Sequence, residues 1–308
     1  MISRTHNMSL KCKPAQPLLY NGYMNKLLTL ALSLPLVACV VGTDDPGTTG
    51  DPGGGDPGGG DPGGGDPGGG GTTPDPQNLK GTISDNFTLS GAVKLTGALT
   101  IDTGATVTVM PGTTIEVTTN TASINVKGTL DVQGAKGNIV TLQPTNPADH
   151  WGGVTVSGTY NLTYGKQVGG PIHTSTGSTT KIVDSEMNRA QGDFIVTSGG
   201  ALDVQYSNLG LESGDTTHCN LHLGAASPLV FTHNNNAGAP YGLMFYAGGG
   251  DFTHNNWITS SGQYAVEPGN SGTADFSGSY FSGGQPTGTT GLKYNNLAGA
   301  RLTDVGPR

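Results

Sequence analysis

The sequence predicts an all-β protein: a parallel β-helix, which is a solenoid of stacked coils, preceded by a disordered linker. Two observations predict this fold. From Leu79 onward, apolar and polar residues alternate over short stretches, with no helical period of useful length. The C-terminal half also repeats itself about every 21–26 residues, a length typical of one solenoid coil. Roughly 230 residues follow the linker, enough for roughly nine or ten coils.

Two columns of equivalent residues define the repeat. The first is mostly aliphatic, and the second is mostly aromatic and is followed by a short polar residue. Equivalent residues stack about 4.8 Å apart, so we expect Phe252 to be buried between Phe231 and Phe276. We expect two strands per coil, joined by a Gly/Ser turn and an Asn-rich turn. The columns are Ile195, Leu221, Leu243, Val266 and Leu292, and Val183, Tyr206, Phe231, Phe252 and Phe276.

The N-terminal part of this region resembles a known superfamily. Residues 128–134, 139–142 and 151–154, preceded by residues 109–115, are similar to repeats of the pectin-lyase-like superfamily. With the two columns, the resemblance covers roughly residues 79–302. It implies a single-stranded, right-handed parallel β-helix. It does not imply one activity, because this fold carries lyases, hydrolases, adhesins and proteins with no known activity.

The N-terminus carries a targeting signal. Met24-Asn25-Lys26, an apolar run over residues 27–34 and small residues up to Cys39 are typical of a secretory signal peptide. The run is too short to span a bilayer of roughly 30 Å. Residues 36–39, Leu-Val-Ala-Cys, resemble the lipobox of bacterial lipoproteins, where cleavage before the cysteine leaves it lipidated. The alternative is an ordinary signal peptide that happens to end in a cysteine.

The lipobox resemblance implies that Cys39 carries palmitate and anchors the chain in the bacterial cell envelope. The outer membrane is the expected site, on its periplasmic face or at the cell surface. Met24 is the expected start, and a long n-region is the alternative. The predicted domains are an upstream extension plus signal peptide over residues 1–38, a lipidated N-terminus and tether over residues 39–76, and the β-helix over residues 77–308.

Residues 44–76 are of low complexity. The unit Asp-Pro-Gly-Gly-Gly recurs four times from Asp51, which predicts a disordered tether with a reach of roughly 30–35 Å. The five-residue period and the lack of apolar residues distinguish it from calcium-binding nonapeptide rolls, so neither a metal nor a cofactor is expected. The net charge is −8, and four of the fourteen basic residues lie before residue 27, which leaves 10 basic against 22 acidic residues, or −12, in the rest of the chain. An acidic surface repels phosphate backbones, so no nucleic-acid partner is expected.

Histidines form the first candidate sites. His218, Cys219 and His222 are of metal-ligand type, but on one strand the two histidines would lie about 13 Å apart. We therefore expect no shared ion, and a cysteine buried as a structural thiol. His233 and His254 recur one coil apart, each followed by two asparagines. They form either a polar groove for a glycan or an ion, or a ladder of turn side chains that satisfies backbone groups.

The other candidates are two carboxylates and one aromatic residue. Asp251 and Asp275 should face outward about 5 Å apart, near the carboxylate spacing of retaining glycosidases. The alternative is an exposed pair without a catalytic role. His150 and Trp151 follow Asp149 and could hold a sugar ring, or the tryptophan could pack over the edge of the solenoid.

These patterns favour a non-catalytic binding or structural module that contacts glycans or other envelope components. The alternative is a polysaccharide lyase or glycoside hydrolase of the same fold. Related lyases generally use an arginine with calcium-binding acids, whereas Arg189 is the sole arginine between residues 5 and 300. The Asn-Thr-Asp and Gly-His-Gly motifs of polygalacturonases are also missing.

Overall fold

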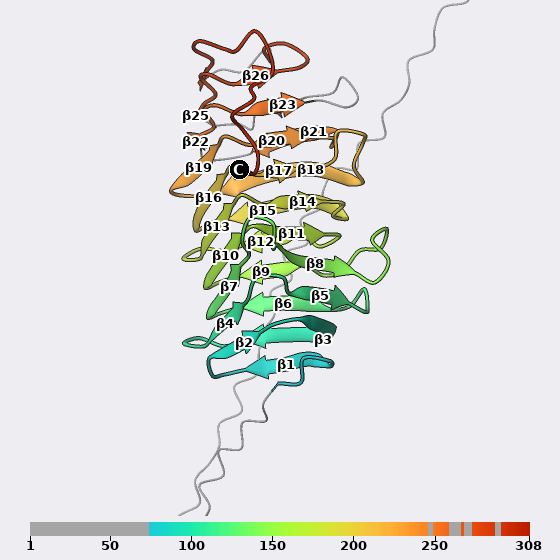
Figure 1. The fold of residues 1–308 in the computed structure, drawn as a ribbon. Coiled ribbons are helices and arrows are strands. Elements are labelled where there is room, and N and C mark those ends of the chain that lie inside the picture. The colour runs from blue at the N-terminus through green and yellow to red at the C-terminus, as the bar shows by residue number, and fades with distance from the viewer. Residues whose placement is uncertain (1–73, 246–248, 259–265, 268–272, 287–290) are drawn as a thin grey trace, which may run out of the picture. The chain divides into compact units, whose positions relative to one another are not determined.

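The computed structural model of this chain describes residues 74–245, 249–258, 266–267, 273–286 and 291–308 (Figure 1). Within these residues the protein is all-β, and its strands form one seventeen-stranded and one ten-stranded sheet. The strands pair in parallel with equivalent strands of neighbouring coils, which confirms the predicted parallel β-solenoid. The predicted signal peptide, Cys39 and nearly all of the predicted tether lie outside the described residues.

Each coil presents three faces. Face I is the ten-stranded sheet, and the seventeen-stranded sheet supplies faces II and III. Face I contains β2 (Phe87–Leu89), β4 (Thr106–Val109), β7 (Thr129–Gln133), β10 (Thr159–Thr163), β13 (Thr179–Val183), β16 (Ala201–Gln205), β19 (Leu229–Thr232), β22 (Gly249–Asp251), β25 (Thr273–Asp275) and β27 (Leu292–Lys293).

The larger sheet divides between the other two faces. Its first strands, β1 (Leu79–Ile83) and β3 (Ala92–Ile101), run along both. Face II then contains β5 (Thr114–Val117), β8 (Val140–Pro144), β11 (Gly165–Val168), β14 (Glu186–Asn188), β17 (Asn208–Leu209), β20 (Asn235–Ala237), β23 (Asn256–Ile258) and β26 (Tyr280–Phe281). Face III contains β6 (Ser123–Val126), β9 (Val154–Val156), β12 (Ile172–Thr174), β15 (Gly192–Ser198), β18 (Thr217–Ala225), β21 (Tyr241–Phe245) and β24 (Val266–Glu267).

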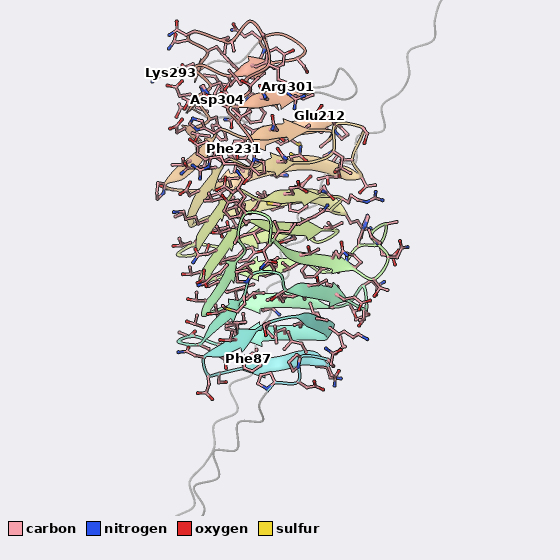
Figure 2. All side chains as sticks on the ribbon, in the orientation of Figure 1. Phe87, Glu212, Phe231, Lys293, Arg301 and Asp304 are labelled. Atoms are coloured by element: carbon pink, nitrogen blue, oxygen red, sulfur yellow. The ribbon has the colours of Figure 1, made fainter. Side chains whose placement is uncertain are left out.

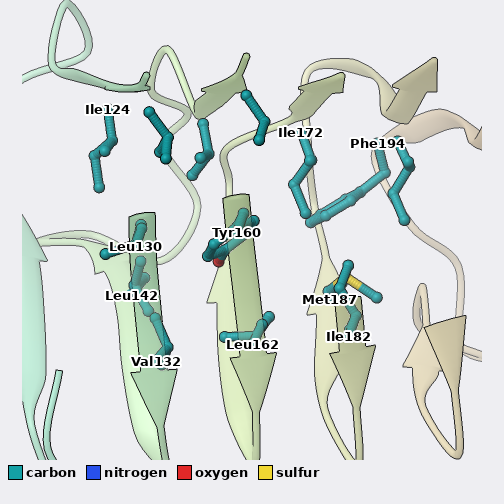
Figure 3. Close-up of a cluster of buried hydrophobic side chains, with 14 of the residues drawn as sticks. Ile124, Leu130, Val132, Leu142, Tyr160, Leu162, Ile172, Ile182, Met187 and Phe194 are labelled. Carbon is teal, nitrogen blue, oxygen red and sulfur yellow. The ribbon is translucent and has the colours of Figure 1, made fainter. Parts of the chain in front are cut away.

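Alternation along the strands places apolar side chains in the interior. Figure 3 shows them converging from all three faces, as with Leu130 of face I, Leu142 of face II and Ile124 of face III. Later coils bury aromatic rings instead. Phe252 is buried between Phe231 and Phe276, with ring centroids 5.9 and 5.2 Å from its own, as predicted.

The predicted aliphatic column is confirmed over four coils. Pairing on face III runs in register from Ile195 through Leu221 and Leu243 to Val266. The assignment of Leu292 as the fifth member of this column is wrong, because Leu292 belongs to β27 and lies on face I. The coils also hold three strands rather than two. The short strands of face II occupy the stretch where the sequence indicated only an Asn-rich turn.

The aromatic column is correct from Phe231 onward and wrong before it. Phe231 pairs with Val204, not with Tyr206, and Val183 pairs with Gln205. Loop lengths differ between coils, so sequence spacing alone does not determine which residues of neighbouring coils pair, and the predicted alignment can be off by one or two residues. Tyr206 fits the pattern by residue type but lies at a corner, where its φ is 49°.

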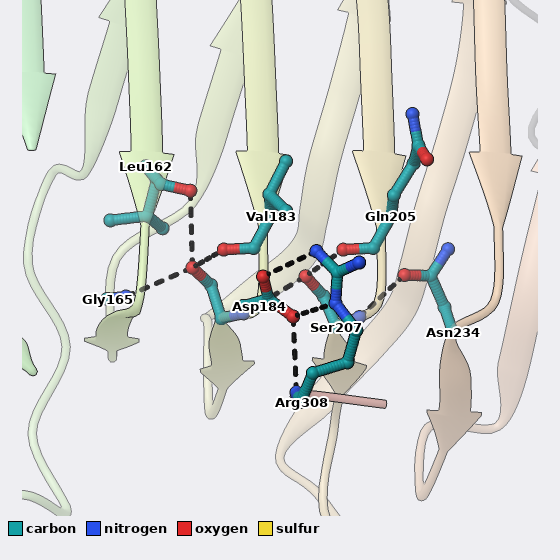
Figure 4. Close-up of polar contacts among 9 residues, drawn as sticks. Leu162, Gly165, Val183, Asp184, Gln205, Ser207, Asn234 and Arg308 are labelled. Atoms are coloured by element: carbon teal, nitrogen blue, oxygen red, sulfur yellow. Dashed lines mark hydrogen bonds and ion pairs between the residues drawn. The ribbon is translucent and has the colours of Figure 1, made fainter. Parts of the chain in front are cut away.

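That corner, between faces I and II, is a regular feature of the coils. Its residues have φ between 43° and 59°, the left-handed region that few non-glycine residues adopt. Gly165 follows the first corner residue, and in the later coils the next residue is a buried serine or asparagine whose side chain accepts a backbone N–H bond from the neighbouring coil, as Ser207 does from Ser185 and Asn234 from Ser207 (Figure 4). The corner residues are Tyr164, Asp184, Tyr206, His233 and His254.

The final segment, residues 298–308, does not continue the solenoid. It turns back along the stack and ends near β16 and β17 (Figure 1). Its amide and side-chain groups bond to residues of several earlier coils, from Ser279 back to Asp184. We call this segment the strap.

Candidate functional site

A hollow of about 620 Å³ lies where the connections between faces II and III project from the stack. The connections after β5 and β8 both extend to this edge in Figure 1. In the next coil, β11 and β12 are joined at the same corner by a short turn that contains glycine. This short turn leaves room beside the longer connection between β8 and β9. The lining residues are Val117, Thr118, Thr119, Asn120, Pro144, Thr145, Ala148, Asp149, His150 and Gln191.

Trp151 anchors the loop that supplies one wall of the hollow. It is 4% exposed, and its indole N–H donates to the carbonyl of Val168 at 2.8 Å. The ring packs on Gly170, where an added Cβ would lie 2.2 Å from the indole carbon Cε2. Trp151 is therefore packed at the solenoid edge, the structural alternative of the sequence analysis, and it offers no free ring face for a sugar to stack on.

His150 is the distinctive group of the hollow. Its Nδ1 is buried and has no hydrogen-bond partner among the described residues, although a buried polar atom normally has one. The preceding Asp149 is exposed, and its carboxylate accepts a hydrogen bond from the Asn146 amide at 3.2 Å. Hydroxyl, amide, carboxylate and imidazole groups thus surround this space, so it suits a polar ligand held by hydrogen bonds.

His233 and His254 pack against one another at the corner between faces I and II, with their rings tilted by 42°. Their ring centroids lie 4.6 Å apart, and Tyr206 stacks on His233 at the same separation. Burial lowers the pKa of His233, and the neighbouring His254 lowers it further. The strap covers this stack, since Asp304 contacts His254 at 2.9 Å and the Gly306 N–H donates to the His233 carbonyl.

The asparagines that follow these histidines form the predicted turn ladder. Asn234 and Asn255 are fully buried, and the Asn234 N–H donates to the Asn255 side chain at 2.7 Å. The Asn255 amide donates in turn to the carbonyls of Phe231 and Phe252, each at 2.7 Å. In the repeated His-Asn-Asn pattern, the asparagine side chains therefore form hydrogen bonds with backbone N–H and C=O groups. This is the ladder of turn side chains, one of the two predicted alternatives.

Asp251 and Asp275 lie directly opposite one another on adjacent coils of face I, as predicted. Each carboxylate accepts the backbone N–H two residues later, Asp251 from Thr253 at 3.0 Å and Asp275 from Ser277 at 2.9 Å. The hydrogen bonds from Ser277 lower the pKa of Asp275 below its ordinary value. A general acid needs a raised pKa, so the Asp275 carboxylate is not suited to that role.

His218 and His222 meet at a residue that the sequence analysis missed. Their Nδ1 atoms lie 2.9 and 2.6 Å from the two carboxylate oxygens of Asp193, a face III neighbour. Both imidazoles thus contact one carboxylate, although the two histidines stand four residues apart on β18. Cys219 and Leu221 face inward as expected, but Asn220 between them is also buried, which breaks the alternation. The one available signal was that Asp193 stands 26 residues before Cys219, one repeat away.

Even so, no group of three or more histidine, cysteine, aspartate or glutamate side chains in the described ranges is arranged to hold a metal ion. Each Asp193 oxygen already serves one imidazole. Cys219 is buried, and its thiol donates a hydrogen bond to the Leu221 carbonyl at 3.1 Å. Across the same ranges, no helix is long and apolar enough to cross a membrane.

Comparison with known proteins adds no assignment to this geometry. No protein-family model, curated protein or solved structure matches the chain.

Proposed function

We propose that this chain is a lipid-anchored lipoprotein of the bacterial cell envelope that displays its β-solenoid as a non-catalytic binding module. The lipobox-like residues ending at Cys39 and the Asp-Pro-Gly-rich tether support the anchor. The regular stack of described coils supports a scaffold role, because its rigid faces hold loops in fixed relative positions. Similarity to pectin-lyase-like repeats is compatible with such a module and does not require catalysis.

The hollow at His150 is the proposed binding site. The observation that carries this assignment is a hollow of about 620 Å³ lined by His150 together with Thr, Asn, Asp and Gln side chains, while the buried Nδ1 of His150 has no hydrogen-bond partner among the described residues. A ligand hydroxyl or amide would satisfy that atom once the His150 ring turns it toward the hollow, and the ligand would exchange its own water contacts for hydrogen bonds to the lining groups. Glycans and other hydroxyl-rich envelope components have this chemistry.

Titration calorimetry of the full chain against soluble polysaccharides and peptidoglycan fragments tests the site. We expect saturable binding that weakens about tenfold in His150→Ala, because one hydrogen bond to a buried group is lost. His173→Ala is the matched control, since this exposed histidine does not line the hollow. Binding by a folded parent that His150→Ala leaves unchanged would contradict the assignment.

The same polysaccharide panel tests the non-catalytic proposal. We expect no new reducing ends and no unsaturated products from the parent protein. Cleavage that disappears in Asp251→Asn/Asp275→Asn with folding intact would replace the proposed module with a lyase or hydrolase.

A further inference from the structure

The strap follows the solenoid axis and lies along a row of corner residues, Asp184, Tyr206, His233 and His254, which we call the corner groove. Its Asp304 contacts His254, its Gly306 N–H donates to the His233 carbonyl, and its Arg308 reaches Asp184. These contacts span three coil steps of about 4.8 Å, or about 14 Å. Four extended residues cover about 13 Å, so Asp304 to Arg308 bridges the coils as an extended chain.

The deepest contact is made by Arg308. Its Nε and Nη2 donate to the two carboxylate oxygens of Asp184 at 2.9 and 2.8 Å, and its backbone N–H donates to the same carboxylate (Figure 4). The guanidinium also lies 3.9 Å from the centroid of the Tyr206 ring. The bidentate hydrogen bonds to the carboxylate and the cation–π contact with the ring together form a specific binding site for a guanidinium group.

The receptor side belongs to the solenoid and is rigid. With the strap in place the Asp184 side chain is 3% exposed, and the Asp184 backbone lies at the corner with a φ of 52°. Ser185, the next residue, joins the buried hydrogen-bond ladder that crosses the coils. The backbone of the groove is therefore held from within the stack, since the Asp184 N–H also donates to the Gln205 carbonyl of the next coil.

The strap itself is held loosely. Among residues 301–308 only Gly306 is buried. The Arg308, Arg301 and Asp304 side chains are 56%, 46% and 67% exposed, although all three form ion pairs. In Figure 2, Arg301 and Glu212 are labelled near one another, and they form the ion pair that joins the strap to the loop after β17. Segments with little buried apolar surface open at low cost.

From these contacts we propose that the corner groove of Asp184, Tyr206, His233 and His254 is a recognition site for an extended, arginine-bearing peptide segment, and that the strap is its detachable occupant. Release of the strap exposes an acidic, aromatic groove that can accept a second segment of the same chemistry. The site is separate from the hollow at His150 and does not depend on it.

Gly306→Ala in the full chain provides a way to release the strap without altering the groove. Gly306 has a φ of 85°, and an added Cβ would lie 2.6 Å from the Asn235 side-chain nitrogen. The probe is a fluorescently labelled peptide with the sequence of residues 298–308, and the readout is fluorescence anisotropy. We expect saturable binding to Gly306→Ala and much weaker binding to the parent, where the strap competes.

Two changes test whether the arginine contact carries recognition. Asp184→Asn in the Gly306→Ala chain keeps the side-chain shape and tolerates positive φ. It should weaken peptide binding by about tenfold to a hundredfold, as should an Arg308→Ala change within the peptide. Asp203→Asn is the control, because this face I carboxylate bonds to Gln205 and not to the strap. Binding that is absent from a folded Gly306→Ala chain, or equal in all variants, would overturn the proposal.

Hydrogen exchange on the unmodified chain tests detachment independently. The Leu302 and Gly306 amides, which bond to Asn256 and His233, should exchange faster than the Ser207 and Asn234 amides of the ladder. Equal exchange at the rate of global unfolding would show that the strap is an integral part of the solenoid, and the proposal would fail.

Discussion

At the scale of single residues, the interior of the later coils depends on aromatic packing. Phe252 is fully buried and contacts Phe231, Phe276 and Trp257. Phe252→Asp removes this packing and buries an unpaired charge, so we expect a loss of several kcal/mol in unfolding free energy. Thr253→Asp at the next, half-buried position should cost less. Comparable falls in Tm for both variants would contradict the assigned register.

The corner histidine makes stability depend on pH. The pKa of His233 is lowered in the folded state, so the unfolded state binds protons more readily. Stability should therefore be fully retained above the unfolded pKa of about 6.5 and decrease as the pH falls below it. His233→Asn removes the titration and keeps a residue that accepts positive φ. Thermal melts at pH 7.5 and 5.5 should show a smaller decrease for the variant, and an equal decrease would exclude His233 as the source.

At the scale of elements, the local sequence pattern predicted the features that repeat in every coil. It did not predict the features that depend on irregular contacts. Alternation and the coil period were enough to place Phe252 and to align Ile195 with Leu221, because stacked coils repeat their inward residues. They did not predict the short face II strands, because two or three residues leave too little alternation to detect. The contact of His218 with Asp193 was also missed, since it depends on an irregular strand register.

The candidate site was predicted only in part for a similar reason. Asp149 and His150 were identified from their residue types, and both line the hollow. The hollow itself depends on the short turn after β11, one coil beyond the His150 loop, and on Gln191, two coils beyond it, and no local pattern joins either to His150. The strap is more distant still, because Arg308 and Asp184 are separated by 124 residues. Their pairing requires the complete stack to bring the two residues together.

At the scale of the whole molecule, the anchor determines where the solenoid works. The short apolar run that ends at Cys39, together with the acidic tether, motivates the prediction that the mature chain begins at a lipidated cysteine. A single acyl chain binds a membrane only marginally, whereas several chains at about 0.8 kcal/mol per buried methylene hold it stably. The parent should therefore incorporate labelled palmitate and sediment with membranes, and Cys39→Ala should do neither.

The buried thiol supplies a matched control for this experiment. Cys219→Ala removes the one cysteine of the described solenoid and leaves the signal sequence intact, so labelling and sedimentation should match those of the parent. Mass spectrometry of the mature N-terminus should identify Cys39 as the first residue and place the acyl chains on it. A Cys39→Ala protein that still incorporates palmitate and stays with the membrane fraction would exclude the lipobox. The solenoid would then need a different means of attachment, because the tether alone contains no apolar segment to hold it at a membrane.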